Sequence, residues 1–490
     1  MTRSAKYLIL LAGLALPCAA ASQREEIRLL QAQLQQLTST VSALQARVRS
    51  LEQAPSATVM QIRQEPMPPP VRETAKPAPA APSKFAMGGD FRLYFDSITR
   101  PAGGGAPRVS NIRGRYLLHL DLAAQMHRTL SIHARLSTGP LNNPLTDIQD
   151  FGGGLARHSL MLSEAYVDYH PNARFRFQGG RVDNVFNDRS AFLFDQDSRF
   201  NGTNESFTLP GKIAKSQVKL MAGQYTFTHP NFPEIVPGTS STAATATPSQ
   251  AFLAAGAKPG TQPRASQLFQ QGALIDTSLS DALTQQAGFD LQLYRNPNQL
   301  RLMSTAGGLF LVGGSIGFNP VGPVPSPGNA TTTPGGAEFT APGFRIGHLT
   351  YTLAHRGLGV FDHSIPMSLN MQMSRNFHHV SDRNGFAIIG SAGRSREAGD
   401  LRLQYAFYRK QANALIGEVT ENDIGIGGNV NMQANSLRIE YTLHRGVIFA
   451  NNIITTKWLK DSNPQARFFV PFGATVPLQF RYQSMLLFRF

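Results

Sequence analysis

The chain has 490 residues, of which 16% are charged and 41% are hydrophobic, and its formal net charge is +15. This length usually implies several domains, although one wide barrel would also account for it because a barrel needs no single compact core. No run of about 18 uncharged apolar residues follows the start of the chain, which excludes a membrane-spanning helix. The absence of such a run does not exclude a transmembrane β-barrel, because the strands of a barrel are short and only half apolar.

Residues 1–21 have the features of a secretory signal peptide. Two basic residues, Arg3 and Lys6, precede the apolar run 7–16, and three alanines before position 22 offer a cleavage site. The sequence therefore predicts export across the inner membrane.

Cys18 is the only cysteine and lies inside this predicted signal peptide. A lipoprotein anchor would need a small residue before the cysteine, and Pro17 fits that requirement poorly. Cleavage after residue 21 leaves a mature chain without cysteine, which excludes disulfides, thiolate metal sites and cysteine nucleophiles together.

Residues 22–54 are predicted to form a short periplasmic coiled coil. Apolar residues recur there at alternating spacings of three and four, with leucine at every d position, a pattern that leans towards dimers. The alternative is an amphipathic helix lying on the chain's own barrel. The predicted core consists of Ile27, Leu30, Leu34, Leu37, Val41, Leu44, Val48 and Leu51.

Residues 55–84 are predicted to be an extended linker. Eight prolines among alanine, glutamate and lysine favour polyproline II, which holds two modules apart.

From residue 85 to residue 490 the sequence predicts a transmembrane antiparallel β-barrel of about 16 strands, within a range of 14 to 18. Apolar and polar residues alternate in segments of roughly ten residues, as membrane barrel strands require. Clear examples are 91–96, 116–122, 130–136, 401–407 and 437–443. A soluble sandwich has the same period, so the alternation alone does not distinguish the two folds.

The last strand favours the membrane barrel. Tyr482, Phe488 and Phe490 share one apolar face at the end of the chain. Outer-membrane barrels commonly end in this way, and we interpret these three residues as a signal for the outer-membrane assembly machinery.

Two segments rich in proline, glycine, serine, threonine and alanine, 228–266 and 319–342, interrupt the strands. Loops of this length are usually either functional or disordered. In a barrel they would fold inward as a constriction or extend on the extracellular side.

Three consecutive segments, Glu164–Tyr169, Phe177–Phe186 and Phe194–Gly202, carry a family resemblance. A Gly-Gly-Arg strand end, a turn, an Asp-x-Asp segment and Asn-Gly follow one another, and Val185 stands where the family usually has proline. Over about residues 85–210 the chain resembles a family of bacterial outer-membrane porins, some of which also carry an N-terminal coiled coil. The resemblance implies a diffusion channel that is often trimeric.

Arginine dominates the charge, since the 46 basic residues comprise 10 lysines and therefore 36 arginines. Arginines on polar strand faces should face the lumen, because a charge in lipid costs about 2–4 kcal/mol near the midplane. A ring of such groups favours anions. The proposed pore-lining residues are Arg92, Arg113, Arg115, Arg135, Arg174, Arg176, Arg345, Arg402 and Arg481.

The alternative to anion preference is a balanced lumen, in which acidic residues offset the arginines. The candidates for this role are Asp90, Asp121, Glu164, Asp168, Asp400 and Glu440.

No cofactor, metal site or catalytic group is predicted. The segment from Asp195 to Gly202 resembles a calcium loop in its spacing, but Arg199 replaces an oxygen donor, so an inward hydrogen-bonded turn is favoured. The twelve histidines show no metal spacing, and no Ser-His-Asp set can be assembled. Nucleic acid is not an expected partner, because the positive charge is dispersed along strands of an exported chain.

The sequence therefore predicts an outer-membrane porin, a passive channel for small hydrophilic or anionic solutes, with its N-terminal segment in the periplasm. Its expected partners are outer-membrane lipid and lipopolysaccharide, the assembly machinery and further copies of itself, in a trimer. The alternative is a structural protein whose coiled coil tethers the envelope while the barrel serves as its anchor.

Overall fold

The computed structural model describes residues 84–140, 145–151, 158–213, 215–227, 260, 264–305, 328–332, 338–360, 363–424, 429–460 and 475–490. The predicted signal peptide and coiled coil, and the predicted linker up to residue 83, lie outside these ranges. So do most of the segment 228–266 and much of 319–342. None of the described helices is long and apolar enough to cross a membrane.

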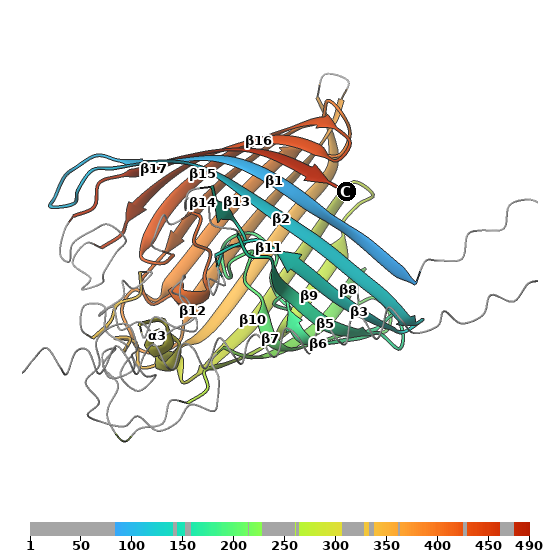
Figure 1. The fold of residues 1–490 in the computed structure, drawn as a ribbon. Coiled ribbons are helices and arrows are strands. Elements are labelled where there is room, and N and C mark those ends of the chain that lie inside the picture. Colours follow the sequence, from blue (N-terminus) through green and yellow to red (C-terminus); the bar gives the residue numbers. More distant parts are fainter. Residues whose placement is uncertain are drawn as a thin grey trace, which may run out of the picture. The chain divides into compact units, whose positions relative to one another are not determined.

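The described residues form one antiparallel sheet that closes on itself (Figure 1). Apart from the two-residue β4, each strand pairs with the next along the chain, and β1 pairs with both β2 and β17, which closes the barrel. The strands are β1 (Phe85–Arg100), β2 (Val109–His127), β3 (Leu130–Ser137), β4 (Gln149–Asp150), β5 (Met161–Tyr169), β6 (Phe175–Val182), β7 (Phe200–Thr208), β8 (Ser216–Thr226), β9 (Gln267–Ser278), β10 (Leu283–Arg295), β11 (Arg345–Val360), β12 (His363–Asn376), β13 (Asn384–Gly393), β14 (Leu401–Lys410), β15 (Met432–His444), β16 (Val447–Trp458) and β17 (Gln479–Arg489).

The predicted 16-stranded barrel is confirmed. Of the 17 paired segments, β4 has only two residues and pairs with β2 beyond the end of β3, so that 16 strands form the wall. Within the described ranges, two short helices lie in the connections, α3 (Pro297–Thr305) and the 3₁₀ turn η1 (Gly417–Val419).

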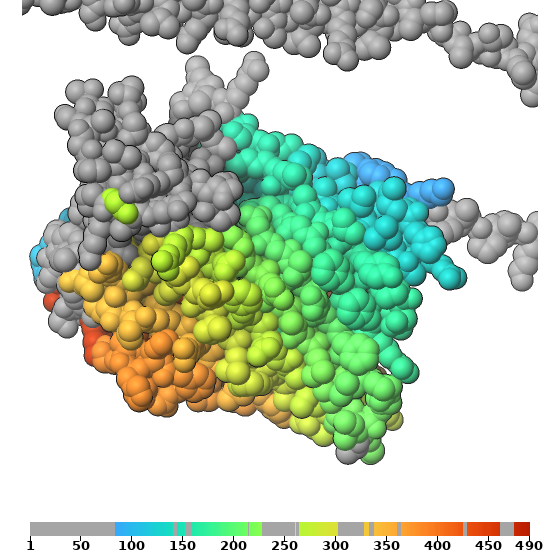
Figure 2. Space-filling view, turned by 90° about the horizontal axis from the view of Figure 1, so that it is seen from below, coloured from blue at the N-terminus to red at the C-terminus, as the bar shows by residue number. Residues whose placement is uncertain are grey.

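Side chains alternate between an apolar outer face and a polar inner face. In β1 the outward residues Leu93 and Phe95 are 36% and 47% exposed, whereas the inward Asp96 is completely buried. A soluble barrel would reverse this arrangement, because its apolar side chains would fill the interior. The outer wall is suited to lipid, and Figure 2 shows part of it, formed by the green to orange strands.

The two ends of the barrel differ in the length of their connections. At one end the strands join through short turns such as 128–129 and 445–446, and at the other through long connections such as 138–160 and 296–344. We call these the short-turn end and the long-loop end. The C-terminus lies at the short-turn end (Figure 1).

A hydrophobic core lies inside the barrel, where the long-loop connections meet inward strand residues. Two connections supply much of it, and we call residues 183–199 loop A and residues 411–424 loop B. Loop A contributes Phe192 and Phe194, and loop B contributes Leu415 and Ile416, all at most 2% exposed. The interior is therefore partly filled by packed loops.

Candidate functional site

The inward face of β1, β2 and β17 carries a network of ion pairs centred on Asp96. Its carboxylate accepts from Arg481 at 2.7 Å and from Arg113 at 2.9 Å, while Arg115 lies 3.5 Å away. Arg113 and Arg115 also reach Asp150 of β4, at 3.1 and 2.6 Å. Three of the predicted arginines are thus brought together across the closure of the barrel.

A second inward group surrounds Glu164 on β5. Arg135 of β3 lies between Asp121 at 2.6 Å and Glu164 at 2.9 Å. Arg199, at the end of loop A, donates to the same Glu164 at 2.5 Å. This ion pair attaches loop A to the wall.

Three further predicted arginines on the inward face also have acidic partners. Arg92 lies 2.5 Å from Asp90, Arg402 lies 3.5 Å from Glu440, and Arg176 pairs with Asp168. Most of the acidic residues proposed to offset the lumenal arginines thus pair with them on the inward face, as a lumen of balanced charge requires.

Arg174 and Arg345 lie elsewhere. Arg174 is exposed in the turn between β5 and β6. Arg345 is exposed at the start of β11, on the same outward face of the strand as Leu349. Asp400 likewise does not face the lumen, because it accepts backbone hydrogen bonds from Arg396 and Glu397 in a short turn.

Loop A crosses the interior to the opposite wall. Tyr408 and Lys410, inward residues of β14, donate to the carbonyl oxygens of Ser190 and Ala191 at 2.9 and 3.1 Å. Gln372 of β12 donates to the carboxylate of Asp188 in the same loop. Loop A therefore spans the lumen from β6 to β12 and β14.

Loop B packs against loop A and continues to the closure of the barrel. The backbone N–H of Asp195 donates to the carbonyl oxygen of Val419 at 3.1 Å. Asp423 of loop B pairs with Arg481 at 3.0 Å, which connects loop B to the Asp96 network. The two loops thus form one internal constriction held from several strands.

Four carboxyl groups, those of Asp195, Asp197, Glu421 and Asp423, gather where the loops meet. Burial, together with the neighbouring Glu421, raises the pKa of Asp195 well above its usual value. Burial and Asp147 raise the pKa of Asp197 to about 6, and burial and Asp423 raise that of Glu421 to about 8. The charge of the constriction should therefore change within the physiological pH range.

A polar cavity lies between this carboxyl cluster and the wall. Three arginines line it, Arg92, Arg189 and Arg438, together with polar strand residues such as Gln404 and Gln483. All four clustered carboxyl groups line the same cavity. It is a water-accessible space of mixed charge within the barrel.

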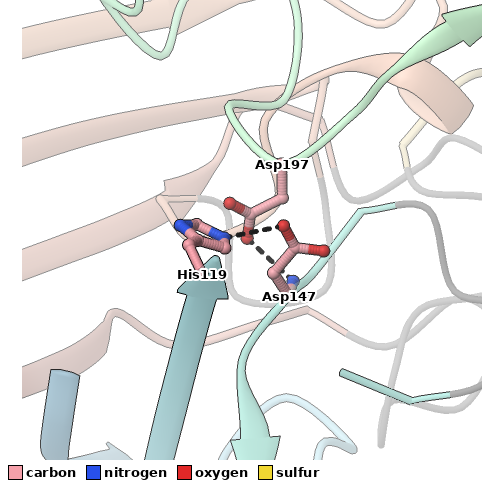
Figure 3. Close-up of side chains that lie close together, drawn as sticks. All are labelled: His119, Asp147 and Asp197. Atoms are coloured by element: carbon pink, nitrogen blue, oxygen red, sulfur yellow. Dashed lines mark hydrogen bonds and ion pairs between the residues drawn. The ribbon is translucent and has the colours of Figure 1, made fainter. Parts of the chain in front are cut away.

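His119, Asp147 and Asp197 offer ligand atoms within 4.8 Å of one another and could hold a divalent cation (Figure 3). His119 Nε2 lies 2.9 Å from Asp147, and its Nδ1 lies 3.1 Å from Asp90. Asp197 accepts from the backbone N–H of Asp147 at 3.0 Å. These hydrogen bonds account for the cluster without a metal.

The segment compared above with a calcium loop forms a hydrogen-bonded turn. The Asp195 carboxylate accepts from the backbone N–H of Asp197 at 2.9 Å, and Arg199 turns away to Glu164. The favoured interpretation of this segment agrees with the geometry.

The residues of the predicted assembly signal lie where the barrel closes. The ring of Phe488 stacks on Phe91 with centroids 6.3 Å apart, and Tyr482 contacts Phe95 edge-on at 6.3 Å. Phe490 is 60% exposed, and its backbone N–H donates to the carbonyl oxygen of Gly89.

Sequence reasoning did not find the partners that organise the interior, namely Asp96, Asp150, Glu421 and Asp423. One available signal was the apolar run 191–194 between charged residues, because a solvated loop seldom contains two phenylalanines. The paired acids at 195/197 and 421/423 were a second signal.

A family model described as "Putative porin" matches residues 107–291. No curated protein matches the chain. Among solved structures, an anion-selective porin from Comamonas acidovorans is 11% identical with a TM-score of 0.41, over 83% of this chain and 99% of that one.

Two other similar structures are OprB from Pseudomonas putida and OmpF from Salmonella typhi in complex with daunomycin. The first is 9% identical with a TM-score of 0.44, over 83% of this chain and 94% of that one. The second is 9% identical with a TM-score of 0.42, over 83% and 97%. The predicted resemblance to bacterial porins is confirmed by the match of residues 107–291 to the family described as "Putative porin".

Proposed function

We propose that this protein is an outer-membrane porin through which small hydrophilic solutes diffuse passively. The observation that carries the proposal is a closed barrel with an apolar outer wall and a charged inner face, in a chain whose residues 107–291 match a porin family. The family match points to a channel rather than an enzyme. Because barrels of this kind have short periplasmic turns and longer extracellular loops, the long-loop end would face outward.

Osmotic swelling of liposomes that contain the purified protein tests this function. Neutral sugars of increasing size should enter at decreasing rates, because loops A and B narrow the lumen. Liposomes that carry correctly folded protein and do not swell with the smallest sugar would refute the proposal.

We further propose a modest preference for anions. Arg92, Arg189 and Arg438 line the cavity, whereas the pKa of Glu421, raised to about 8, keeps much of its negative charge suppressed near pH 7. The pKa of Asp195 is raised as well, by burial and by the neighbouring Glu421. Of the inward residues predicted from the sequence, Arg113, Arg115, Arg135, Arg176, Arg402 and Arg481 would add to the lumenal field, although each has an acidic partner.

We also propose an oligomeric state, an assembly signal and a role for the N-terminal segment. The family resemblance supports a homotrimer, and the position of Tyr482, Phe488 and Phe490 at the barrel closure supports recognition by the assembly machinery.

The heptad pattern of 22–54 supports an additional role as an envelope tether. Deletion of residues 22–83 separates the two functions, because a tether would lose cell-wall association whereas a porin would keep its conductance.

A further inference from the structure

Three arginines stand on the outer wall at the long-loop end of three consecutive strands. Arg295 ends β10, Arg345 begins β11, and Arg375 lies on β12 next to the last residue of that strand. All three side chains are exposed. We call them the arginine triad. They share the outward face with apolar residues of the same strands, such as Leu293 and Met373, which are 44% and 62% exposed.

The strand register places the triad in one diagonal row. Leu293 pairs with Arg345 and Gly347 pairs with Arg375, so each arginine lies two residues from the partner of the next. Such diagonal neighbours are roughly 7–8 Å apart between Cα atoms. Three guanidinium groups are therefore close enough to act on one ligand with more than one anionic group.

Acidic side chains do not neutralise the triad within the described part of the chain. The sequences of β11 and β12 contain no aspartate or glutamate. The one acid of β10, Asp290, is 1% exposed and bonds His348 on the inward face. This contrasts with the inward arginines of the candidate site, each of which has an acidic partner.

An exposed aromatic ring lies beside the triad. Phe377 follows β12, is 54% exposed, and packs over Gly347, where an added Cβ would lie 2.7 Å from a ring atom. Further from the long-loop end, Leu349 and Met373 continue an exposed apolar surface. A ligand with anionic groups at one end and apolar chains below would match this surface.

We propose that the arginine triad binds the phosphate groups of an anionic lipid whose acyl chains lie along β10 to β12. Guanidinium groups form bidentate, charge-assisted hydrogen bonds with phosphate. The proposal rests on the proposed function, which places the long-loop end in the outer leaflet, where lipopolysaccharide supplies such phosphates. A cation on the lipid face costs only about 0–1 kcal/mol near the interface, so the position is compatible with the membrane.

The test is a binding titration of the full-length protein in detergent micelles with bisphosphorylated lipid A. Its dephosphorylated form and inorganic phosphate serve as comparison ligands. The variant Arg295→Gln/Arg345→Gln/Arg375→Gln should bind the bisphosphorylated lipid at least tenfold more weakly. The matched control Arg356→Gln/Arg394→Gln/Arg396→Gln removes three exposed arginines at or near the short-turn end and should change affinity less than twofold.

Equal affinity of the triad variant and the wild type, or equal losses in both triple variants, would overturn the proposal. So would binding of inorganic phosphate or the dephosphorylated lipid as tight as that of lipid A. The single variant Arg375→Gln, with heat-modifiable migration as the check of folding, keeps the test valid if the triple variant does not fold. The titration needs no conductance, so a failure of lipid binding is distinguishable from a failure of the channel.

Discussion

At the scale of single residues, Asp96 stabilises the closure of the barrel through its ion pairs. Its buried carboxylate serves Arg481 and Arg113, which come from the two strands that flank β1. Arg481 is itself only 3% exposed, so it depends on Asp96 and Asp423 for its counter-charge. Removing one partner of a buried pair leaves an uncompensated charge, which is more costly than the pair is worth.

Replacing Asp96 by asparagine should therefore lower the free energy of unfolding by about 3–5 kcal/mol. The matched control is Asp121→Asn, because Asp121 is 44% exposed and its partner Arg135 retains Glu164. A solvated pair of that kind is worth about 1 kcal/mol or less. Urea unfolding in detergent or lipid measures both, and equal losses would show that burial of the Asp96 network has no special effect.

The arginines that line the polar cavity should determine the preference of the channel for anions over cations. The double variant Arg92→Gln/Arg438→Gln removes two positive charges from the lining and should shift the reversal potential towards cations. Arg174→Gln, which changes an exposed turn, should leave it unchanged. An unaltered reversal potential in the double variant would mean that ions do not pass along this cavity.

At the scale of elements, local sequence predicted the strands and did not predict loops A and B. Alternation over 91–96 determines which side chains face inward because it depends only on neighbouring residues. The constriction depends on contacts such as Lys410 to the carbonyl of Ala191, which are separated by 219 residues. Arg345 shows a related limit, since an arginine beside a predicted strand can face outward once it reaches the membrane interface.

The packing of loops A and B should weaken as the pH rises. The folded pKa values of Glu421, about 8, and Asp197, about 6, lie above the ordinary carboxyl range. Their contribution to stability is thus complete below about pH 4 and decreases as the pH rises through these folded values. Ionised Glu421 faces Asp423, Asp197 and Asp195, and Lys410 is its cationic neighbour.

Channel conductance should accordingly increase between pH 5 and pH 9, while the anion preference decreases. Glu421→Gln cannot ionise, so in this variant the part of the change near pH 8 should disappear. Single-channel recordings across this pH range measure both quantities. A wild-type protein with the same conductance and selectivity at both pH values would contradict this account of the loops.

At the scale of the whole molecule, the barrel has distinct ends and a partly filled interior. Pairing of β1 with β17 leaves no unpaired edge in the sheet, and the long connections gather at one end. The number of strands was predictable from the spacing of alternating segments. The degree of filling was not, because it depends on the three-dimensional meeting of loops that are distant in sequence.

Water and ions should cross this barrel despite loops A and B. Single-channel recording of the purified protein in a planar bilayer under a salt gradient tests it most directly. We expect discrete, ohmic openings whose reversal potential has the sign of an anion preference at neutral pH. Complete absence of openings from correctly folded protein would contradict it and would identify the barrel as a closed anchor.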